Sequence, residues 1–223
     1  MLIRYLKSIV LALYVVPLAV LAQDDDGNRY GYDRHYRSEI SAASAYLEST
    51  NQEYHHHKHH HRRAIIIDVR TIEEHVGGHP PNAYSIPYPH IYNRQHDPDK
   101  GDYIGQDPAD FVAAVNALHL RKNTLIITMC RTGARSVHAG NLLADAGYTN
   151  VRNMWQGFVG KLKQNTSGED LDLDGNGVVD SGPYSGDLDG WANYQGLPIS
   201  KKLKPSRLYY PYFGMYYSVT GER

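Results

Sequence analysis

Short apolar runs alternate with helix-like segments through the middle of this chain. The apolar runs are rich in β-branched residues and too short for helices, which favours buried strands. The segments between them repeat apolar residues at helical spacing. The strand-like runs lie at residues 64–69, 83–87, 124–129 and 151–154, and the helix-like segments at 38–50, 107–120 and 136–146. This alternation predicts an α/β fold with a small parallel sheet flanked by helices, in which ligands bind beyond the carboxyl ends of the strands.

Local signals mark where the helices begin and end. Ser38 can cap the first helix, whose residues Ile40, Ala43, Tyr46 and Leu47 fall on one face. Asp107 followed by a proline is a good start for the second helix, and Gly147 closes the third. Residues 165–189 are crowded with Asp, Gly and Ser, and they interrupt this pattern as an acidic insertion.

The two ends of the chain differ in character from this core. A basic start, an apolar stretch over residues 9–19 and small residues before position 22 are typical of a secretory signal peptide cleaved after Ala22. We therefore expect an exported protein, periplasmic or extracellular, without a stable membrane anchor, because Pro17 interrupts an apolar run shorter than about 20 residues. Residues 199–223 form a tyrosine-rich tail that we expect to lie on the surface of its own domain or to contact a protein partner.

Residues 23–63 lack periodicity apart from the first helix, and they predict a flexible N-terminal region. This region carries six histidines within residues 55–61. Neutral imidazoles bind zinc, copper or nickel, but such tracts usually hold these ions loosely. We expect no catalytic role for the tract.

Composition limits the function further. The 223 residues, 41% of them hydrophobic, suffice for one well-buried domain, which we place at residues 64–198. The 23 basic residues are balanced by 24 acidic ones, so no electrostatic footprint indicates a nucleic-acid partner. A single cysteine excludes an intramolecular disulfide. That cysteine is therefore either buried and inert or used in chemistry.

Cys130 follows the strand-like run at 124–129 and precedes the helix at 136–146. Loop amides and the positive end of a helix both favour negative charge on sulfur. Gly133 allows an unusual backbone angle, so the loop can curl its amides toward the sulfur, while Arg131 and Arg135 add positive charge. These features favour a reactive thiolate that holds an anion or a persulfide over an inert core cysteine.

These residues together resemble the rhodanese family. The resemblance covers residues 64–198 apart from the insertion, and its motifs lie at residues 67–70, 73–75, 78–83, 85–87, 130–136, 153–158, 189–191 and 196–198. It implies a sulfurtransferase in which Cys130 takes a sulfane sulfur from thiosulfate or a persulfide and passes it to cyanide or a thiol. No cofactor is implied for this catalysis. Residues 80–83 depart from the family's usual Ile-Pro-Gly-Ala, which concerns a turn and no reacting group.

The resemblance also implies roles for particular residues. The loop amides would cradle the transferred sulfur, and Arg131 is a candidate for contacting an anionic donor. Asp68 and Arg70 would organise the pocket, and we expect Asp68 to pair with Arg135. The residues assigned to the substrate cradle are Arg131, Thr132, Gly133, Ala134, Arg135 and Ser136.

Two alternatives to sulfur transfer remain open. Phosphatases and arsenate reductases that use cysteine enclose an oxyanion in a loop one residue longer, with arginine six positions after the cysteine. Here arginine comes five positions after Cys130, and Ser136 is the sixth residue. The other alternative is a non-catalytic module that binds a partner or handles metal ions.

The acidic insertion contains a pattern typical of EF-hand calcium loops. Oxygen side chains occupy its positions one, three, five and nine, with glycine at six. The candidate ligands are Asp172, Asp174, Asn176, Val178 and Asp180. Position twelve is Pro183, so Asp187 or Asp189 would have to replace the usual carboxylate. We expect a weak structural Ca²⁺ site that ties the closing segment of the domain near the Cys130 loop.

Overall fold

The computed structural model describes residues 28–50 and 63–221. Both the leader-like segment and the histidine tract lie outside the described residues. No helix in the described ranges is long and apolar enough to cross a membrane.

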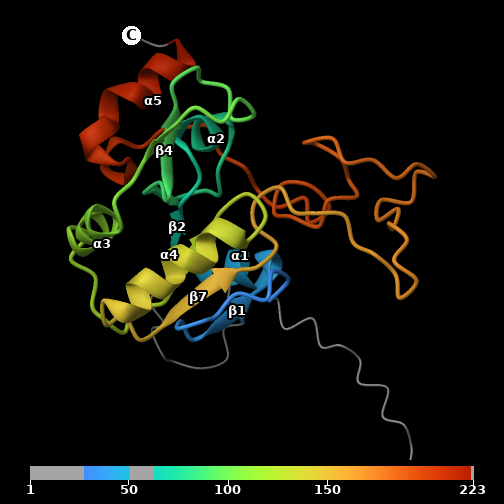
Figure 1. Ribbon diagram of the computed structural model, residues 1–223, viewed down its shortest axis with the longest axis horizontal. Helices are drawn as coiled ribbons and strands as arrows, with labels where there is room; N and C mark the ends of the chain where they lie inside the picture. Colours follow the sequence, from blue (N-terminus) through green and yellow to red (C-terminus); the bar gives the residue numbers. More distant parts are fainter. Residues whose placement is uncertain (1–27, 51–62, 222–223) are drawn as a thin grey trace, which may run out of the picture.

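A five-stranded parallel sheet forms the centre of the molecule (Figure 1), in the order β1-β7-β6-β2-β3. Each neighbouring pair of these strands is parallel, and residues Ile65 to Asp68 of β2 pair with Ile126 to Met129 of β6. The strands are β1 (Ser38–Ile40), β2 (Ile65–Asp68), β3 (Tyr84–Ser85), β6 (Ile126–Met129) and β7 (Val151–Met154). The predicted α/β class with a parallel sheet flanked by helices is thereby confirmed.

Helices cover both faces of this sheet. Neighbouring residues of a strand point to opposite sides, so a strand that is apolar throughout presents an apolar surface on each face. Ile67 joins a core with residues of the third and fourth helices, whereas Ile66 joins a core with the first helix and Trp191. The helices are α1 (Ala42–Thr50), α2 (Ile72–Gly77), α3 (Pro108–Asn116), α4 (Ala134–Asp145) and α5 (Phe213–Thr220).

Some element boundaries differ from those expected. Residues 38–40 pair with β7 as an edge strand, so Ser41 and not Ser38 caps α1, accepting a hydrogen bond from the N–H of Ser44 at 3.1 Å. Asp107 caps α3 as expected and accepts from the N–H of Ala109 at 2.7 Å. An antiparallel hairpin of β4 (His90–Asn93) and β5 (Tyr103–Gly105) was missed, because its strands are short and separated by a polar loop.

The C-terminal segment is part of the folded domain. It forms two short 3₁₀ turns (Pro205–Arg207 and Tyr210–Tyr212) before α5, which packs against α2. Tyr216 of α5 is fully buried, and its hydroxyl donates to Ser85 Oγ at 2.8 Å. In contrast, residues 165–184 of the acidic insertion are largely exposed and extend away from the sheet (Figure 1).

Candidate active site at the Cys130 loop

The Cys130 loop joins β6 to α4 at the carboxyl edge of the sheet. Cys130 comes directly after β6 and is only 1% exposed. Helix α4 begins four residues later, at Ala134. The topology therefore places the thiol where parallel sheets bind ligands, close to a helix N-terminus.

Two groups of its own loop approach the sulfur of Cys130. The N–H of Gly133 donates to Sγ at 3.1 Å. Ser136 Oγ lies 3.4 Å from the same sulfur and 3.0 Å from the carbonyl oxygen of Gly133. The Gly133 N–H stabilises negative charge on the sulfur, and the single proton of the Ser136 hydroxyl is shared between the sulfur and the nearer Gly133 carbonyl.

The segment after β7 fixes the shape of this loop from behind. The carbonyl of Cys130 accepts from the N–H of Phe158 at 2.8 Å, and that of Arg131 accepts from Val159 at 2.8 Å and Gly160 at 3.1 Å. These bonds hold the carbonyls of Cys130 and Arg131 on the side of residues 158–160, away from the sulfur that accepts from the Gly133 N–H.

Gly133 is required at its position for two reasons. Its φ angle is +100°, and a Cβ built there would lie 2.1 Å from the carbonyl oxygen of Trp155. Any side chain would therefore push the loop away from the segment that supports it. Gly133 therefore provides both the unusual backbone angle expected from the sequence and the close approach between the loop and the Trp155 backbone.

Arg135 pairs with Glu74 and not with Asp68, which corrects the expected ion pair. Its two terminal nitrogens contact the two Glu74 oxygens at 2.8 and 2.9 Å. Glu74 is placed by a capping box in which Thr71 and Glu74 bond each other's backbone N–H at the start of α2. Burial opposes the charge on Glu74, but the Arg135 guanidinium lowers the pKa of that carboxyl below its usual value. The Arg135 guanidinium is thus engaged by Glu74 through both of its terminal nitrogens.

Asp68 organises a buried cluster instead. It accepts from Arg70 through both carboxylate oxygens, at 2.9 and 2.7 Å, and from His75 Nδ1 at 2.8 Å. Burial disfavours its charge, yet Arg70 and His75 hold the pKa of Asp68 below its ordinary range. The Arg70 guanidinium also lies 3.9 Å from the centre of the Phe158 ring. The Asp68 and Arg70 pair therefore connects the start of α2 with the segment behind the Cys130 loop.

Two histidines complete this cluster. The His75 and His79 rings stack with their centres 3.9 Å apart, and His79 Nδ1 lies 2.9 Å from the carbonyl oxygen of His75. Carboxylate and carbonyl oxygens only accept, so both Nδ1 atoms carry the proton. Burial lowers the pKa of His75, and burial together with the neighbouring His75 lowers the pKa of His79 to about 4.

Arg131 keeps a more open position than Arg135. Its side chain is 42% exposed and lies 3.7 Å from Asp99 of the β4–β5 hairpin. Such an exposed pair is weak and exchanges readily with other anions. Of the two loop arginines, Arg131 is the one available to a charged donor.

Comparison with known families agrees with this geometry. Residues 50–163, about half of the chain, match the family described as the rhodanese-like domain. The chain belongs to the rhodanese-like domain family. Among curated proteins, it is 35% identical over 95 residues to rhodanese-like domain-containing protein 17 of Arabidopsis thaliana, covering 42% of this chain and 54% of that protein.

Two further comparisons describe the extent of the similarity. The chain is 34% identical over 92 residues to the chloroplastic thiosulfate sulfurtransferase 16 of Arabidopsis thaliana, covering 41% of this chain and 68% of that protein. A crystal structure of Rv0390 from M. tuberculosis superposes with a TM-score of 0.46 at 21% identity, covering 75% of this chain and 99% of that one. The chain spans about half the length of the first curated relatives.

One contact to the rhodanese-like loop comes from a segment that the sequence predicts to be flexible. The hydroxyl of Tyr30 lies 2.9 Å from the carbonyl oxygen and 2.7 Å from the Oγ1 of Thr132. Beside it, Arg29 pairs with Asp189 at 2.5 Å and lies over the Trp155 ring. The glycine, aspartate and arginine residues around Tyr30 are typical of flexible chain, and a single packed tyrosine produces no periodic pattern. The sequence therefore carries no signal for this contact.

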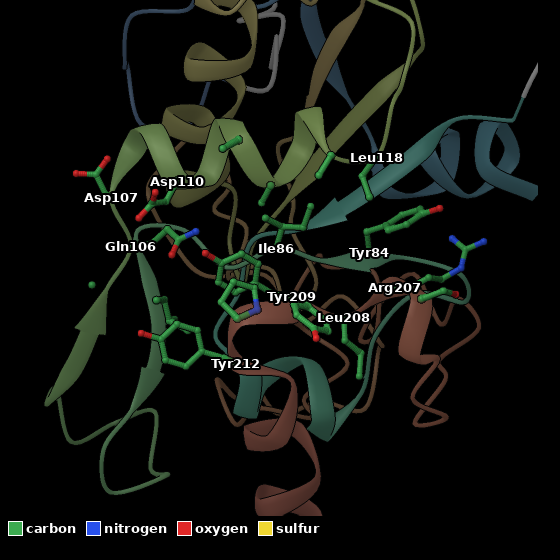
Figure 2. Close-up of a pocket in the computed structure, with 18 residues that line it drawn as sticks. Tyr84, Ile86, Gln106, Asp107, Asp110, Leu118, Arg207, Leu208, Tyr209 and Tyr212 are labelled. Carbon is green, nitrogen blue, oxygen red and sulfur yellow. The ribbon is translucent and has the colours of Figure 1, made fainter.

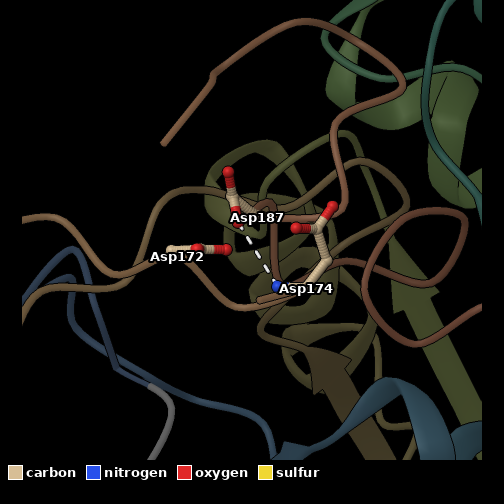
Figure 3. A group of neighbouring side chains, drawn as sticks. All are labelled: Asp172, Asp174 and Asp187. Carbon is tan, nitrogen blue, oxygen red and sulfur yellow. Dashed lines mark hydrogen bonds between the residues drawn. The ribbon is translucent and has the colours of Figure 1, made fainter. Parts of the chain in front are cut away.

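The acidic insertion brings three of its carboxylates together (Figure 3). One oxygen from each of Asp172, Asp174 and Asp187 lies within 4.8 Å of the others. Asp172 accepts from the backbone N–H groups of Gly175, Asn176 and Gly177, while Asp187 accepts from those of Leu173, Asp174 and Asp180. Asn176 and Asp180 belong to the same turn, with Asn176 Oδ1 bonded to the N–H of Val178 and Asp180 Oδ1 to that of Gly182. Of the two replacements considered for the missing twelfth ligand, Asp187 joins the cluster, whereas Asp189 bonds Arg29 and Lys161.

Proposed function

We propose that this rhodanese-like domain is a sulfurtransferase in which Cys130 carries the transferred sulfur. The observation that carries the proposal is the position of Sγ, which lies 3.1 Å from the Gly133 N–H inside a loop whose carbonyls are bonded elsewhere. A relative of 34% identity is named a thiosulfate sulfurtransferase, which agrees with this chemistry.

The reaction has two steps that balance without a cofactor. The Cys130 thiolate attacks the outer sulfur of thiosulfate, forming a Cys–S–S⁻ persulfide as the bond to sulfite breaks and sulfite leaves. Cyanide or a thiolate then attacks the terminal sulfur, and the Cys130 thiolate is regenerated. Gly133 and Ser136 would stabilise the negative sulfur, and Arg131 would bind the anionic donor.

Two alternatives predict different results. A phosphatase needs room for a tetrahedral oxyanion and an arginine free to bind it, whereas Arg135 is held by both oxygens of Glu74. A non-catalytic module would leave Cys130 unmodified by any sulfur donor. The contacts of the Gly133 N–H and the Ser136 hydroxyl with Sγ support a bound sulfur atom better than they support a bound phosphate.

The decisive measurement is the intact mass after incubation with thiosulfate. We expect an increase of one sulfur atom on the wild type, removal of that increase by cyanide, and thiocyanate as the product. Cys130→Ser should show neither, while its thermal unfolding stays close to wild type because the side chain is similar in size. Hydrolysis of p-nitrophenyl phosphate without any persulfide would instead support the phosphatase.

We further propose that the acidic insertion binds Ca²⁺ through Asp172, Asp174 and Asp187, with Asn176, Val178 and Asp180 of the same turn as further oxygen ligands. The support is the EF-hand-like spacing in the sequence together with the meeting of Asp187 with two loop carboxylates. Three carboxylate oxygens match the hard-ligand preference of calcium.

A further inference from the structure

A cavity of about 700 Å³ lies between α3 and the C-terminal segment (Figure 2). None of its lining residues belongs to the Cys130 loop. Its size falls within the range of roughly 300–1,000 Å³ typical of small-molecule sites. It is therefore a second place where this protein could hold a ligand.

The walls of the cavity are apolar and aromatic. One side is formed by small residues of α3, including Ala113 and Ala114, and by Leu118 in the turn that follows this helix. The opposite side carries tyrosine rings, and Figure 2 shows Tyr209 and Tyr212 facing the helix across the opening. A space between small aliphatic side chains and tyrosine rings suits a flat aromatic molecule.

Gln106 places an unsatisfied polar group in this apolar setting. The residue is only 7% exposed, and its Nε2 atom has no hydrogen-bond partner. Its backbone N–H is already used, donating to the carbonyl oxygen of Pro89 at 2.8 Å. In Figure 2 the Gln106 side chain extends from the end of β5 toward the Tyr209 ring. Buried amides normally find a partner, so this one is prepared for an acceptor on a ligand.

The charges around the cavity indicate which acceptor fits. Asp107 and Asp110 lie at the same end as Gln106, whereas Arg207 lies at the opposite end (Figure 2). Arg207 is engaged with the carbonyl of Asn82 and lies 4.6 Å from the centre of the Tyr84 ring. Two carboxylates beside Gln106 disfavour an anionic ligand there. The acceptor is therefore a neutral carbonyl, and an N–H beside it could donate to Asp110.

We propose that this cavity is a binding site for flat aromatic molecules that carry a neutral amide group. The rings lie between α3 and the tyrosines, the ligand carbonyl accepts from Gln106 Nε2, and the ligand N–H faces Asp110. This ligand class differs from the anionic sulfur donors proposed for Cys130, and no residue lining the cavity belongs to the Cys130 loop.

Three aromatic amides serve as probes: benzanilide, 1-naphthamide and indole-3-carboxamide. Binding to the full chain is followed by saturation-transfer NMR and by calorimetry. We expect saturable binding of at least one probe with a Kd on the order of 0.1–1 mM, as ligands of this size allow. N-Benzylaniline, which lacks the carbonyl of benzanilide, should bind more weakly.

Variants locate the site. Ala113→Trp fills the cavity from an exposed helix position and should reduce affinity at least about tenfold. Ala109→Trp, also exposed on α3 but not lining the cavity, should bind as wild type does. Gln106→Met keeps the length of the side chain, removes the donor and should weaken binding about fivefold.

Several results would overturn the proposal. These are failure of all three probes to saturate, equal affinity of wild type and Ala113→Trp, or unchanged affinity in Gln106→Met. A change in sedimentation coefficient caused by Ala113→Trp alone would show that the cavity is instead an interface between copies. Thermal unfolding of each variant confirms that it is folded before binding is measured.

Discussion

The Cys130 loop and the acidic insertion are both irregular segments, but they are held in different ways. Cys130, Gly133 and Ser136 of the Cys130 loop are buried, and backbone bonds from residues 158–160 fix the carbonyls of Cys130 and Arg131. The acidic insertion is mostly exposed, and aspartate and asparagine side chains close its turns by accepting backbone N–H groups. The first segment therefore needs no ligand to keep its shape, whereas the second concentrates negative charge that a cation would offset.

The largest effect should come from a methyl group added inside the Cys130 loop. Gly133→Ala places a Cβ about 2.1 Å from the Trp155 carbonyl oxygen at a positive φ angle. We expect a loss of roughly 3 kcal/mol or more in the free energy of unfolding and loss of persulfide formation. Urea unfolding and intact mass after thiosulfate measure the two effects.

Gly147→Ala is the matched control, because Gly147 also has a positive φ but nothing lies within 4 Å of the added Cβ. It should cost about 1 kcal/mol and leave persulfide formation intact. Equal losses in the two variants would show that backbone strain alone matters and that the contact with Trp155 does not.

Acid should weaken the cluster behind the Cys130 loop. Burial and the neighbouring His75 lower the pKa of His79 to about 4 in the folded protein, below the ordinary histidine value of about 6.5, so the unfolded chain takes up the proton first. Stability is therefore complete above about pH 6.5 and falls as the pH drops toward 4, by up to about 3 kcal/mol for this residue. The lowered pKa of His75 acts in the same direction.

Urea unfolding at pH 7 and at pH 4.5 measures this loss. His79→Gln removes the titrating group and should reduce the difference between the two pH values. The carboxylates of Asp68 and Glu74, whose pKa values are also lowered, contribute only at still lower pH. A stability that is flat from pH 7 to 4.5 in the wild type would contradict the buried neutral histidine pair.

The ion pair between Glu74 and Arg135 should contribute less to the free energy of unfolding than the buried histidine pair does. Glu74→Gln keeps the shape but removes the charge facing a guanidinium whose side chain is 23% exposed. We expect a loss of about 1–2 kcal/mol in urea unfolding, since the pair is largely but not fully buried. Asp102→Asn breaks the exposed pair with Arg94 and should cost no more than about 0.5 kcal/mol.

Sequence patterns predicted the parallel sheet and the position of the cysteine, because short β-branched apolar runs and helix caps are local signals. The strand at 151–154 was placed at its observed bounds, and Asp107 was correctly assigned as a helix cap. The partner of Arg135 was not predictable, since Asp68 and Glu74 are both carboxylates near the loop and only the capping box at Thr71 decides between them. The docking of Tyr30 on Thr132 depends on tertiary packing alone, which leaves no periodic trace in the sequence.

The smallest effect should come from calcium at the acidic insertion. At a Ca²⁺ concentration ten times its Kd, we expect about 1.4 kcal/mol of added stability. Asp172→Asn removes a carboxylate from the cluster and should abolish most of this gain, while Asp170→Asn, in the same segment but outside the cluster, should keep it. The same unfolding experiment with Mg²⁺ in place of Ca²⁺ is the control for non-specific screening of charge. Equal stabilisation by the two ions would contradict a calcium-selective site.

Calcium should leave the KM for thiosulfate nearly unchanged, because backbone bonds close the Cys130 loop without help from the insertion. Just after the insertion, Trp191 and Ala192 donate to the carbonyls of Gly157 and Phe158, which belong to the segment that supports the Cys130 loop. A KM that falls severalfold with calcium in the wild type but not in Asp172→Asn would show that the insertion controls the loop, and it would remove the distinction drawn between the two segments.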